Sequence, residues 1–246
     1  MENRTIDINV DMGEGMGNES FIMPYISSCN IACGGHAGNY ETMQKVVRLA
    51  KQHQVKVGGH PSFPDRDHFG RKPMEMSCVA LYAAIKNQIK DLIVVLKEEN
   101  VPLHHVKPHG ALYNIAAIDV KTANVIVEVM KALQLPAKLY VPYRSVIAKV
   151  AAENNIPVCY EAFADRNYNA NLSLVSRTEQ HAIIDDVEAM FQQVLSIYKK
   201  QRVKTISGDW AMLRANTFCI HGDHPNATNM VGNLVKKLEK QGYKIR

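Results

Sequence analysis

Short apolar runs alternate along the chain with longer stretches whose apolar residues recur at helical spacing. The short runs predict seven β-strands, at residues 5–10, 28–32, 55–59, 103–107, 138–141, 158–162 and 217–220. The longer stretches predict six helices, at residues 40–53, 77–99, 119–133, 145–154, 178–199 and 227–240. Because strands and helices alternate, we expect a parallel sheet covered by helices, a fold of the α/β class. Seven repeats favour an irregular seven-stranded (β/α) barrel, and an open doubly wound sheet is the alternative.

Length and composition indicate one folded unit. The chain has 246 residues, of which 46% are hydrophobic and 22% are charged, and this suffices for one large core. No stretch rich in Pro, Ser and Gly and no long run of charges divides the sequence. We therefore expect residues 1–246 to form a single (β/α) barrel domain.

Charge and hydropathy exclude several classes of partner. The formal net charge is +5, but the basic residues are scattered and form no Lys/Arg block interleaved with aromatics. No window approaches the ~20 apolar residues that span a bilayer, and residues 1–4 lead into the first strand without a signal peptide. The five cysteines are widely spaced and lack a C-x-x-C pair, which indicates reduced thiols. We expect a cytoplasmic protein with no nucleic acid or membrane partner.

Polar and Gly-rich clusters begin where the predicted strands stop. The clusters occupy residues 7–14, 30–38, 58–62, 105–114, 163–168 and 221–225. In parallel α/β folds the carboxyl ends of the strands form the active-site face. We therefore predict a polar active site on this edge of the barrel.

The first cluster places Asp7, Asn9 and Asp11 on one face of a strand, because successive side chains point to opposite faces. This face should point into the barrel, since the apolar residues between them would pack against helices. Two buried carboxylates are costly without a cation, a partner or a shared proton, and this favours a functional role. A calcium loop is excluded, because Met12 and Asn18 stand where such a loop needs Gly and Glu.

A second polar row consists of His105, Lys107 and His109, which share one face of an extended segment. Pro108 disfavours a helix here, so the two histidines should lie ~13 Å apart and should not bind one metal ion together. Lys107 can hold a carboxylate or a phosphate, and His109 is an acid–base candidate. A solvated lysine and a structural histidine are the alternatives.

Two Gly-Gly-His turns, at 34–36 and 58–60, each place an imidazole just past a strand. Glycines there permit close approach of a substrate and supply backbone N–H donors. One such turn would be an ordinary tight turn with a surface histidine. Two in successive units, together with His221 after the last strand, favour a shared site.

For four other residues the sequence allows either a functional or a structural role. Asp165 and Arg166 form either a substrate clamp or a local ion pair. Asp223 either acts at the mouth of the site or caps the helix that starts near Pro225. Cys33 has the residue type of a nucleophile, but a small packing residue is the simpler account, and we assign it no covalent role.

Six strings of residues resemble the LamB/YcsF family in order and spacing. They run from Asp7 to Pro225 and read D-I-N-V-D-M-G-E, N-I-A-C-G-G-H-A-G, G-G-H-P-S-F-P-D, H-V-K-P-H-G-A-L-Y-N, F-A-D-R-N-Y and C-I-H-G-D-H-P. The ordered set is far more specific than any one string. Gly35 and Gly59 stand where the family more often has an aromatic residue and an alanine, and residues 140–145 replace a Gly-containing turn.

The resemblance implies a barrel related to the glycoside hydrolase/deacetylase superfamily. It also implies a hydrolase activity, that of one component of an ATP-dependent 5-oxoprolinase. Such enzymes open the lactam of 5-oxo-L-proline to L-glutamate while ATP is hydrolysed to ADP and phosphate. In the family this component, the A subunit, works with two others, the B and C subunits. The resemblance also implies ATP as a cofactor at the level of the complex, and a divalent metal is possible. Because the chain lacks a G-x-x-x-x-G-K-[ST] loop, any nucleotide contact of its own would be of another type.

On this hypothesis Asp11 or His109 acts as general base, and Lys107 and the Gly-turn amides stabilise the oxyanion. Arg166 is expected near the substrate carboxylate. The other residues expected to bind substrate are Asp7, Asn9, Gly35, His36, His60, His105, Asn114, Asp165, His221 and Asp223.

Two rival functions remain open at this point. One is a metal-dependent amide hydrolase or deacetylase, in which Asp11, His36 and either His60 or His109 hold a divalent ion that activates water. The other is a non-catalytic protein that binds a small molecule within a complex.

Overall fold

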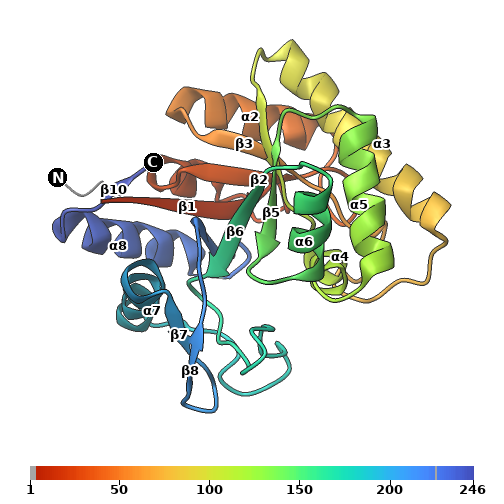
Figure 1. The fold of residues 1–246 in the computed structure, drawn as a ribbon. Coiled ribbons are helices and arrows are strands. Elements are labelled where there is room, and N and C mark those ends of the chain that lie inside the picture. The colour runs from red at the N-terminus through yellow and green to blue at the C-terminus, as the bar shows by residue number, and fades with distance from the viewer. Residues whose placement is uncertain (1–3, 225) are drawn as a thin grey trace.

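The predicted strands form a closed parallel barrel in a computed structural model that describes residues 4–224 and 226–246 (Figure 1). Within these residues the barrel order is β1-β2-β3-β4-β5-β6-β9, and β9 pairs with β1 to close it. The seven strands are β1 Thr5–Met12, β2 Ser28–Ala32, β3 Lys56–His60, β4 Leu103–Val106, β5 Lys138–Pro142, β6 Val158–Phe163 and β9 Thr217–Ile220. The α/β class and the seven-stranded barrel are thus confirmed, and the open sheet is excluded.

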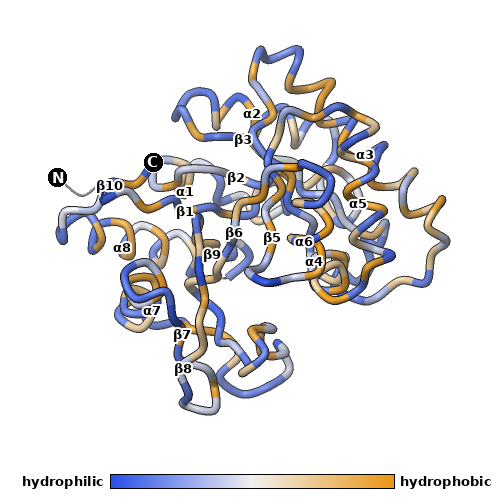
Figure 2. The backbone as a smooth tube through the Cα atoms, viewed as in Figure 1, coloured by the Kyte–Doolittle hydropathy of each residue, from blue (hydrophilic) through white to orange (hydrophobic). Residues whose placement is uncertain are grey.

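Helices pack around the outside of the barrel (Figure 1). The longer ones are α2 Tyr40–His53, α3 Cys78–Glu98, α5 Val120–Ala132, α6 Val146–Glu153, α7 Val187–Lys200 and α8 Ala227–Lys240. Ser77 and Asp119 cap α3 and α5, as their positions before the apolar stretches predict, because their side-chain oxygens accept backbone N–H bonds. Hydrophobic and hydrophilic positions alternate along these helices (Figure 2), which gives each one an apolar face for the barrel.

The core lies between the strands and the helices. Ile6, Ile8 and Val10 of β1 are 0–1% exposed and pack in this layer, whereas the alternate residues of β1 point into the barrel. This alternation is what carries polar side chains inward at the strand ends. No helix in the described part of the chain is long and apolar enough to cross a membrane.

The helix predicted at 178–199 is wrong at its start, because α7 begins only at Val187. The segment from 165 to 186 is instead an irregular loop. Its backbone carbonyls are bonded by distant side chains, since Arg166 donates to Val175 O and Ala182 O and Asn167 donates to His181 O. Long-range bonds of this kind leave no helical periodicity in the sequence.

Several small elements were not predicted. They are α1 Glu19–Ile22, a 3₁₀ helix Met23–Tyr25, α4 Gly110–Ala116, an antiparallel hairpin of β7 Arg202–Lys204 and β8 Trp210–Met212, and β10 Lys244–Ile245, which extends β1. Each is too short to produce a periodic pattern of its own.

Candidate active site

The polar row on β1 lies inside the barrel at three depths. Asp7 is at the amino end, where its carboxylate accepts hydrogen bonds from Thr217 Oγ1 at 2.6 Å and Ser28 Oγ at 3.2 Å. Asn9 lies one layer higher and donates to Thr217 Oγ1 at 2.8 Å. Asp11 is at the carboxyl end. Of the three predicted site residues on β1, Asp11 is therefore the one at the active-site edge.

Lys107 is the electrostatic centre of this edge. It follows β4 and is 2% exposed. Its Nζ lies 2.9 Å from Asp11 Oδ1, 3.0 Å from Glu161 Oε1 and 3.1 Å from Cys219 Sγ. An ammonium group has three N–H donors. An oxyanion would therefore compete with Asp11 and Cys219 for the hydrogen bonds of Lys107 and with Glu161 for its charge.

Three imidazoles and one carboxyl group converge beside Asp11. His60 Nε2 lies 3.4 Å from Asp11 Oδ2 and 2.9 Å from His109 Nδ1. The His36 ring stacks on the His109 ring with centroids 3.6 Å apart, and His36 Nε2 lies 3.1 Å from Glu14 Oε1. Glu14 Oε1 lies 3.5 Å from His109 Nδ1. Of the three histidines predicted to share a site, His36 and His60 meet here, but the third imidazole is His109, whereas His221 is bonded to Asp165.

Hydrogen bonds on the far side of two rings fix where their protons lie. His60 Nδ1 donates to Lys107 O at 2.8 Å, and His109 Nε2 donates to Phe69 O at 2.9 Å, because a carbonyl oxygen only accepts. Burial lowers the pKa of His109 well below its ordinary value and that of His36 to about 2. In their neutral forms His60 and His109 would face each other with two lone pairs across 2.9 Å. This contact requires a shared proton or another cation between the rings.

Burial and paired charges set the ionisation of the carboxyl groups. Burial alone would raise the pKa of Asp11, but the charges of His60 and Lys107 outweigh it and hold that pKa well below 3.8. Burial alone would lower the pKa of Lys107, but Asp11 outweighs it and raises that pKa. Glu14 behaves in the opposite way, since burial and the charge of Asp11 raise its pKa well above 4.5. The site thus contains one carboxylate held ionised and one carboxyl that favours its proton.

His105 lies one layer deeper in the barrel. Its Nε2 is 2.6 Å from Asn30 Oδ1, and its ring stacks on Tyr140 at 3.9 Å. Asn30 in turn donates to Asp11 Oδ1 at 2.7 Å. Gly58 makes room for this imidazole, because a Cβ there would lie 2.1 Å from His105 Nε2. His105 therefore supports Asp11 through Asn30 from below.

Asp165 and Arg166 face different partners. Asp165 Oδ2 accepts hydrogen bonds from the backbone N of His221 at 2.8 Å and from its Nδ1 at 2.9 Å. Arg166 is buried and donates to Val175 O at 2.5 Å and Ala182 O at 3.2 Å. The carboxylate thus orients His221, whereas the guanidinium holds the loop before α7.

Asp223 lies at the mouth of the site and caps no helix. Its carboxylate accepts a hydrogen bond from Arg71, and Arg177 Nη1 lies 3.6 Å away. The N-cap residue of α8 is Asn226, so Asp223 does not cap this helix. Pro225, the predicted helix start, lies outside the described residues.

Two further residues expected to bind substrate contribute no side chain to this cluster. Asn114 is exposed on α4, whereas its neighbour Tyr113 is buried. Gly35 is a packing position, because a Cβ there would lie 2.3 Å from Gln88 Oε1 and 2.4 Å from Ser62 Oγ. A substrate role for these two residues stays a prediction.

Three residues of the site were not predicted: Glu14, Asn30 and Glu161. Glu14 ends the first polar string, and Gly13 before it has a positive φ of 75° that turns the chain after β1. Asn30 and Glu161 are polar residues at inward positions of otherwise apolar strands. That pattern is a usable signal, since a buried polar group needs partners inside the barrel.

Four of these residues could hold a metal ion. Glu14, His36, His60 and His109 each offer one ligand atom, and these atoms lie within 4.8 Å of one another. Nitrogen and oxygen ligands of this kind suit zinc and similar divalent ions. Buried His36 Nδ1 has no hydrogen-bond partner among the described residues, which fits a site that expects one more group. Asp11, which the sequence placed in the ligand set, lies beside this group: its Oδ1 accepts a hydrogen bond from Lys107, and its Oδ2 lies 3.4 Å from His60 Nε2.

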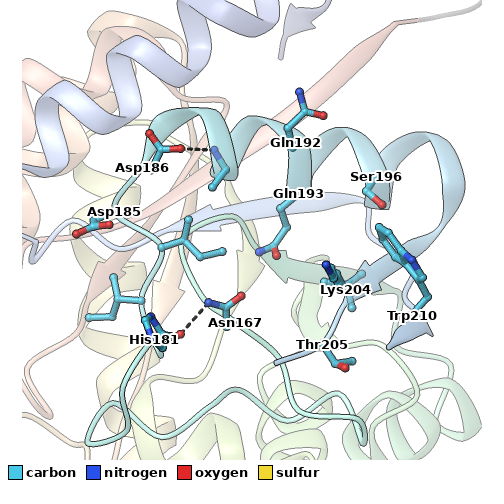
Figure 3. A pocket seen from close by; sticks show the side chains of 14 residues that line it. Asn167, His181, Asp185, Asp186, Gln192, Gln193, Ser196, Lys204, Thr205 and Trp210 are labelled. Atoms are coloured by element: carbon cyan, nitrogen blue, oxygen red, sulfur yellow. Dashed lines mark hydrogen bonds between the residues drawn. The ribbon is translucent and has the colours of Figure 1, made fainter. Parts of the chain in front are cut away.

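A larger cavity lies elsewhere, between α7 and the β7–β8 hairpin (Figure 3). It measures about 480 Å³ and is walled by the loop before α7 and by Trp210. Its polar side chains serve local structure, since Asp186 caps α7 and Asn167 donates to His181 O. Among the described residues that line this cavity, there is no cluster of titratable groups comparable to the one at the barrel mouth.

The sequence model of the LamB/YcsF family matches residues 6–246. This chain belongs to the LamB/YcsF family. It is 39% identical to a protein from Pyrococcus abyssi that is named as the A subunit of 5-oxoprolinase, over 245 residues, 98% of this chain and 96% of that one. A protein of the same name from Pyrococcus horikoshii is 38% identical with the same coverage.

The LamB/YcsF fold is also found in a solved structure. The crystal structure of a lactam utilization protein from Thermus thermophilus superposes with a TM-score of 0.92 at 38% sequence identity. The match covers 98% of this chain and 99% of that one. The family and the barrel expected from the six sequence strings are therefore confirmed.

Proposed function

We propose that this chain is the A subunit of an ATP-dependent 5-oxoprolinase, which opens 5-oxo-L-proline to L-glutamate while ATP is hydrolysed to ADP and phosphate. The observation that carries the proposal is the match along 98% of the chain to relatives that bear this name. The buried cluster at the barrel mouth supports it, because it supplies fixed charge and proton-transfer groups side by side.

The reaction needs activation, because an unstrained lactam carbonyl is a poor electrophile and its amine is a poor leaving group. Phosphorylation of the amide oxygen by ATP makes the ring carbon a better target for water. Water then adds to this carbon and the C–N bond breaks, so that the ring nitrogen leaves as the amine and an acyl phosphate remains. A second water molecule cleaves this acyl phosphate to give L-glutamate and phosphate. A base must take the proton of the attacking water, and an acid must protonate the nitrogen.

Residues at the strand ends have the arrangement that these steps require. Asp11 is held ionised by Lys107, which we assign to positioning because it already donates hydrogen bonds to Asp11 and Cys219 and pairs its charge with Glu161. Asp11 Oδ2 lies 3.4 Å from His60 Nε2, and His60 in turn contacts His109. In this proposal protons move between Asp11, His60 and His109 through these contacts.

The other parts of the proposal concern the complex. The name of the relatives implies further subunits, and we propose that ATP is bound and cleaved by the complex with the B and C subunits. We also expect the complex to be cytoplasmic. The site of ATP cleavage and the location both depend on the B and C subunits, so they are tested with the assembled complex.

Reconstitution tests the proposal directly. The chain is co-expressed with candidate B and C subunits, and oxoproline-dependent ADP and glutamate formation are measured. Asp11→Asn and His109→Ala should each reduce turnover by about 10²–10⁴-fold. His53→Ala, at the end of α2, is the matched control and should leave turnover unchanged. Intact turnover in both site variants would overturn the assignment.

A metal-dependent amide hydrolase is the second candidate, and the cluster of Glu14, His36, His60 and His109 favours it. Bound there, a divalent ion would acidify a water molecule and polarise the substrate carbonyl. The chain's own residues would position the ion, with the second nitrogens of His60 and His109 fixed by carbonyl groups.

Elemental analysis separates the two candidates. The metal-dependent candidate predicts about one divalent ion per chain, its loss in Glu14→Gln, and loss of activity with a chelator. A metal-free complex with full activity would exclude it. Unchanged oxoproline turnover by the partner subunits without this chain would instead support a non-catalytic binding role.

A further inference from the structure

A second, smaller cavity of about 160 Å³ opens at the mouth of the barrel. Its walls come from the ends of β6 and β9 and from the loop before α7, and they include Arg177, His221 and Asp223. Its size suits a ligand about as large as one amino acid, well below the volume of drug-sized sites.

Two arginines converge on the one carboxylate at this cavity. Arg71, from the loop after β3, donates a hydrogen bond to Asp223, and Arg177 Nη1 lies 3.6 Å from the same Oδ2. The two side chains are 38% and 31% exposed, whereas that of Asp223 is 16% exposed. The arginines therefore bring one positive charge more than Asp223 balances.

A third arginine nearby adds to this surplus of positive charge. Burial lowers the pKa of Arg166, and the charge of Arg177, which lines the same cavity, lowers it further. Arg166 is engaged with backbone carbonyls of the loop before α7. Arg71 and Arg177 are thus the groups left to meet an incoming anion.

The cavity adjoins the catalytic cluster through two aromatic contacts. The His221 ring stacks on Phe163 with centroids 5.3 Å apart, and Lys107 Nζ lies 5.3 Å from the Phe163 centroid. On the other side Arg71 lies over the Phe69 ring at 4.9 Å, and Phe69 O accepts the hydrogen bond of His109. An anion held by the arginines would therefore lie near Lys107 on one side and near His109 on the other.

We propose that Arg71 and Arg177 form the subsite for the substrate carboxylate, and that the Asp223 side chain occupies this position in the free protein. The inference rests on the proposed function and moves the carboxylate contact from Arg166 to these two residues. Guanidinium groups bind carboxylates through paired hydrogen bonds, which an ammonium cannot reproduce. In 5-oxo-L-proline the carboxylate and the lactam carbonyl flank the ring nitrogen, so anchoring one directs the other along Phe163 toward Asp11.

Kinetics of the reconstituted complex test this subsite. Arg177→Met and Arg71→Met should each raise KM for 5-oxo-L-proline roughly ten- to hundredfold with little change in kcat, because a charged hydrogen bond is lost in ground and transition states alike. Arg177→Lys should recover only part of the loss. Arg48→Met, which removes an exposed arginine of α2 that pairs with Glu99, is the control. Unchanged KM in both site variants would overturn the proposal.

Two probes keep this test separate from the proposed function. Calorimetry on the purified chain compares 5-oxo-L-proline with its primary amide, which lacks the charge. Binding of the acid alone, lost in Arg177→Met, supports the subsite even if the complex turns over no oxoproline. Equal binding of acid and amide, or tighter binding of inorganic phosphate than of the acid, would overturn the carboxylate assignment.

Asp223→Asn gives a gain of binding that mere structural damage would not produce. Without the competing carboxylate, the acid should bind about two- to fivefold more tightly, as expected for removal of a partly exposed ion pair. Weaker binding of the acid to this variant would contradict a position shared by Asp223 and substrate.

Discussion

The barrel mouth and the cavity beside α7 differ in what their polar residues do. The cavity beside α7 is about three times the volume of the one at the mouth, at about 480 Å³ against 160 Å³. Its carboxylate and amide groups cap a helix and bond loop carbonyls. At the mouth, Lys107, Asp11, His60 and His109 are buried, and each contacts the next at 2.9–3.4 Å. Convergent buried charge, and not cavity volume, is therefore the basis on which we propose the barrel mouth as the active site.

The largest expected effect comes from removing the charge at the centre of the mouth. Lys107→Met leaves Asp11 and Glu161 without their buried partner and should lower the free energy of unfolding by about 3–5 kcal/mol. The matched surface change is Lys131→Met, which breaks an exposed pair with Glu128 and should cost less than about 1 kcal/mol. Urea unfolding measures both. Equal losses would remove the distinction between the buried and the surface pair.

Adjacent glycines on β3 allow a sharper comparison within the mouth. Gly58→Ala places a Cβ 2.1 Å from His105 Nε2 and should destabilise the fold by about 1–3 kcal/mol while loosening the support of Asp11. Gly59→Ala meets Leu92 Cδ2 at 3.4 Å and should change stability by less than about 1 kcal/mol. Thermal unfolding with a turnover assay checks the pair. A larger effect at Gly59 would contradict the described packing.

The pH dependence of stability tests the two opposite carboxyl groups. Glu14 has a raised pKa, so above 4.5 the folded chain holds more protons than the unfolded chain, and this contribution falls as pH rises. Glu14→Gln should therefore gain stability relative to the wild type as pH increases above 4.5, measured by urea unfolding in chelator.

Asp11→Asn should behave in the opposite way. The pKa of Asp11 is lowered below 3.8, so its contribution is present above that value and is lost as pH falls through the folded-state pKa. The wild type should thus lose stability faster than this variant in acid. Parallel curves for either variant would show that its carboxyl group titrates alike in the folded and unfolded chain.

The smallest effect is expected at the larger cavity. Trp210 is 52% exposed on β8 and lines that cavity. Trp210→Ala should leave turnover by the reconstituted complex unchanged. A strong loss of turnover would place part of the function at this cavity and undo the contrast with the mouth.

The barrel and the inward polar row were predictable from local pattern. Strand alternation placed Asp7, Asn9 and Asp11 on one face, and the positions of the polar strings after strands indicated the active edge. The depth of each residue was not predictable, because it depends on register between neighbouring strands. Asp7 therefore appeared equivalent to Asp11, although it lies at the opposite end of the barrel.

Contacts between loops that are distant in the sequence were also not predictable. The pairing of Arg71 and Arg177 with Asp223 joins three separate loops, and no spacing rule connects them. Arg166 was expected near the substrate carboxylate because an arginine can bind a carboxylate through paired hydrogen bonds, and it belongs to a polar string after a strand. Glu161 was missed although its inward position in an apolar strand is a usable signal, because its partner Lys107 follows a different strand.

Turnover by the reconstituted complex tests the central claim most directly. Oxoproline-dependent formation of ADP and L-glutamate is measured with this chain omitted, with the wild-type chain and with Asp11→Asn. The account predicts that both products form together only with the wild-type chain, and that Asp11→Asn loses about 10²–10⁴-fold of the rate. Full turnover without the chain, or with Asp11→Asn in its place, would contradict it.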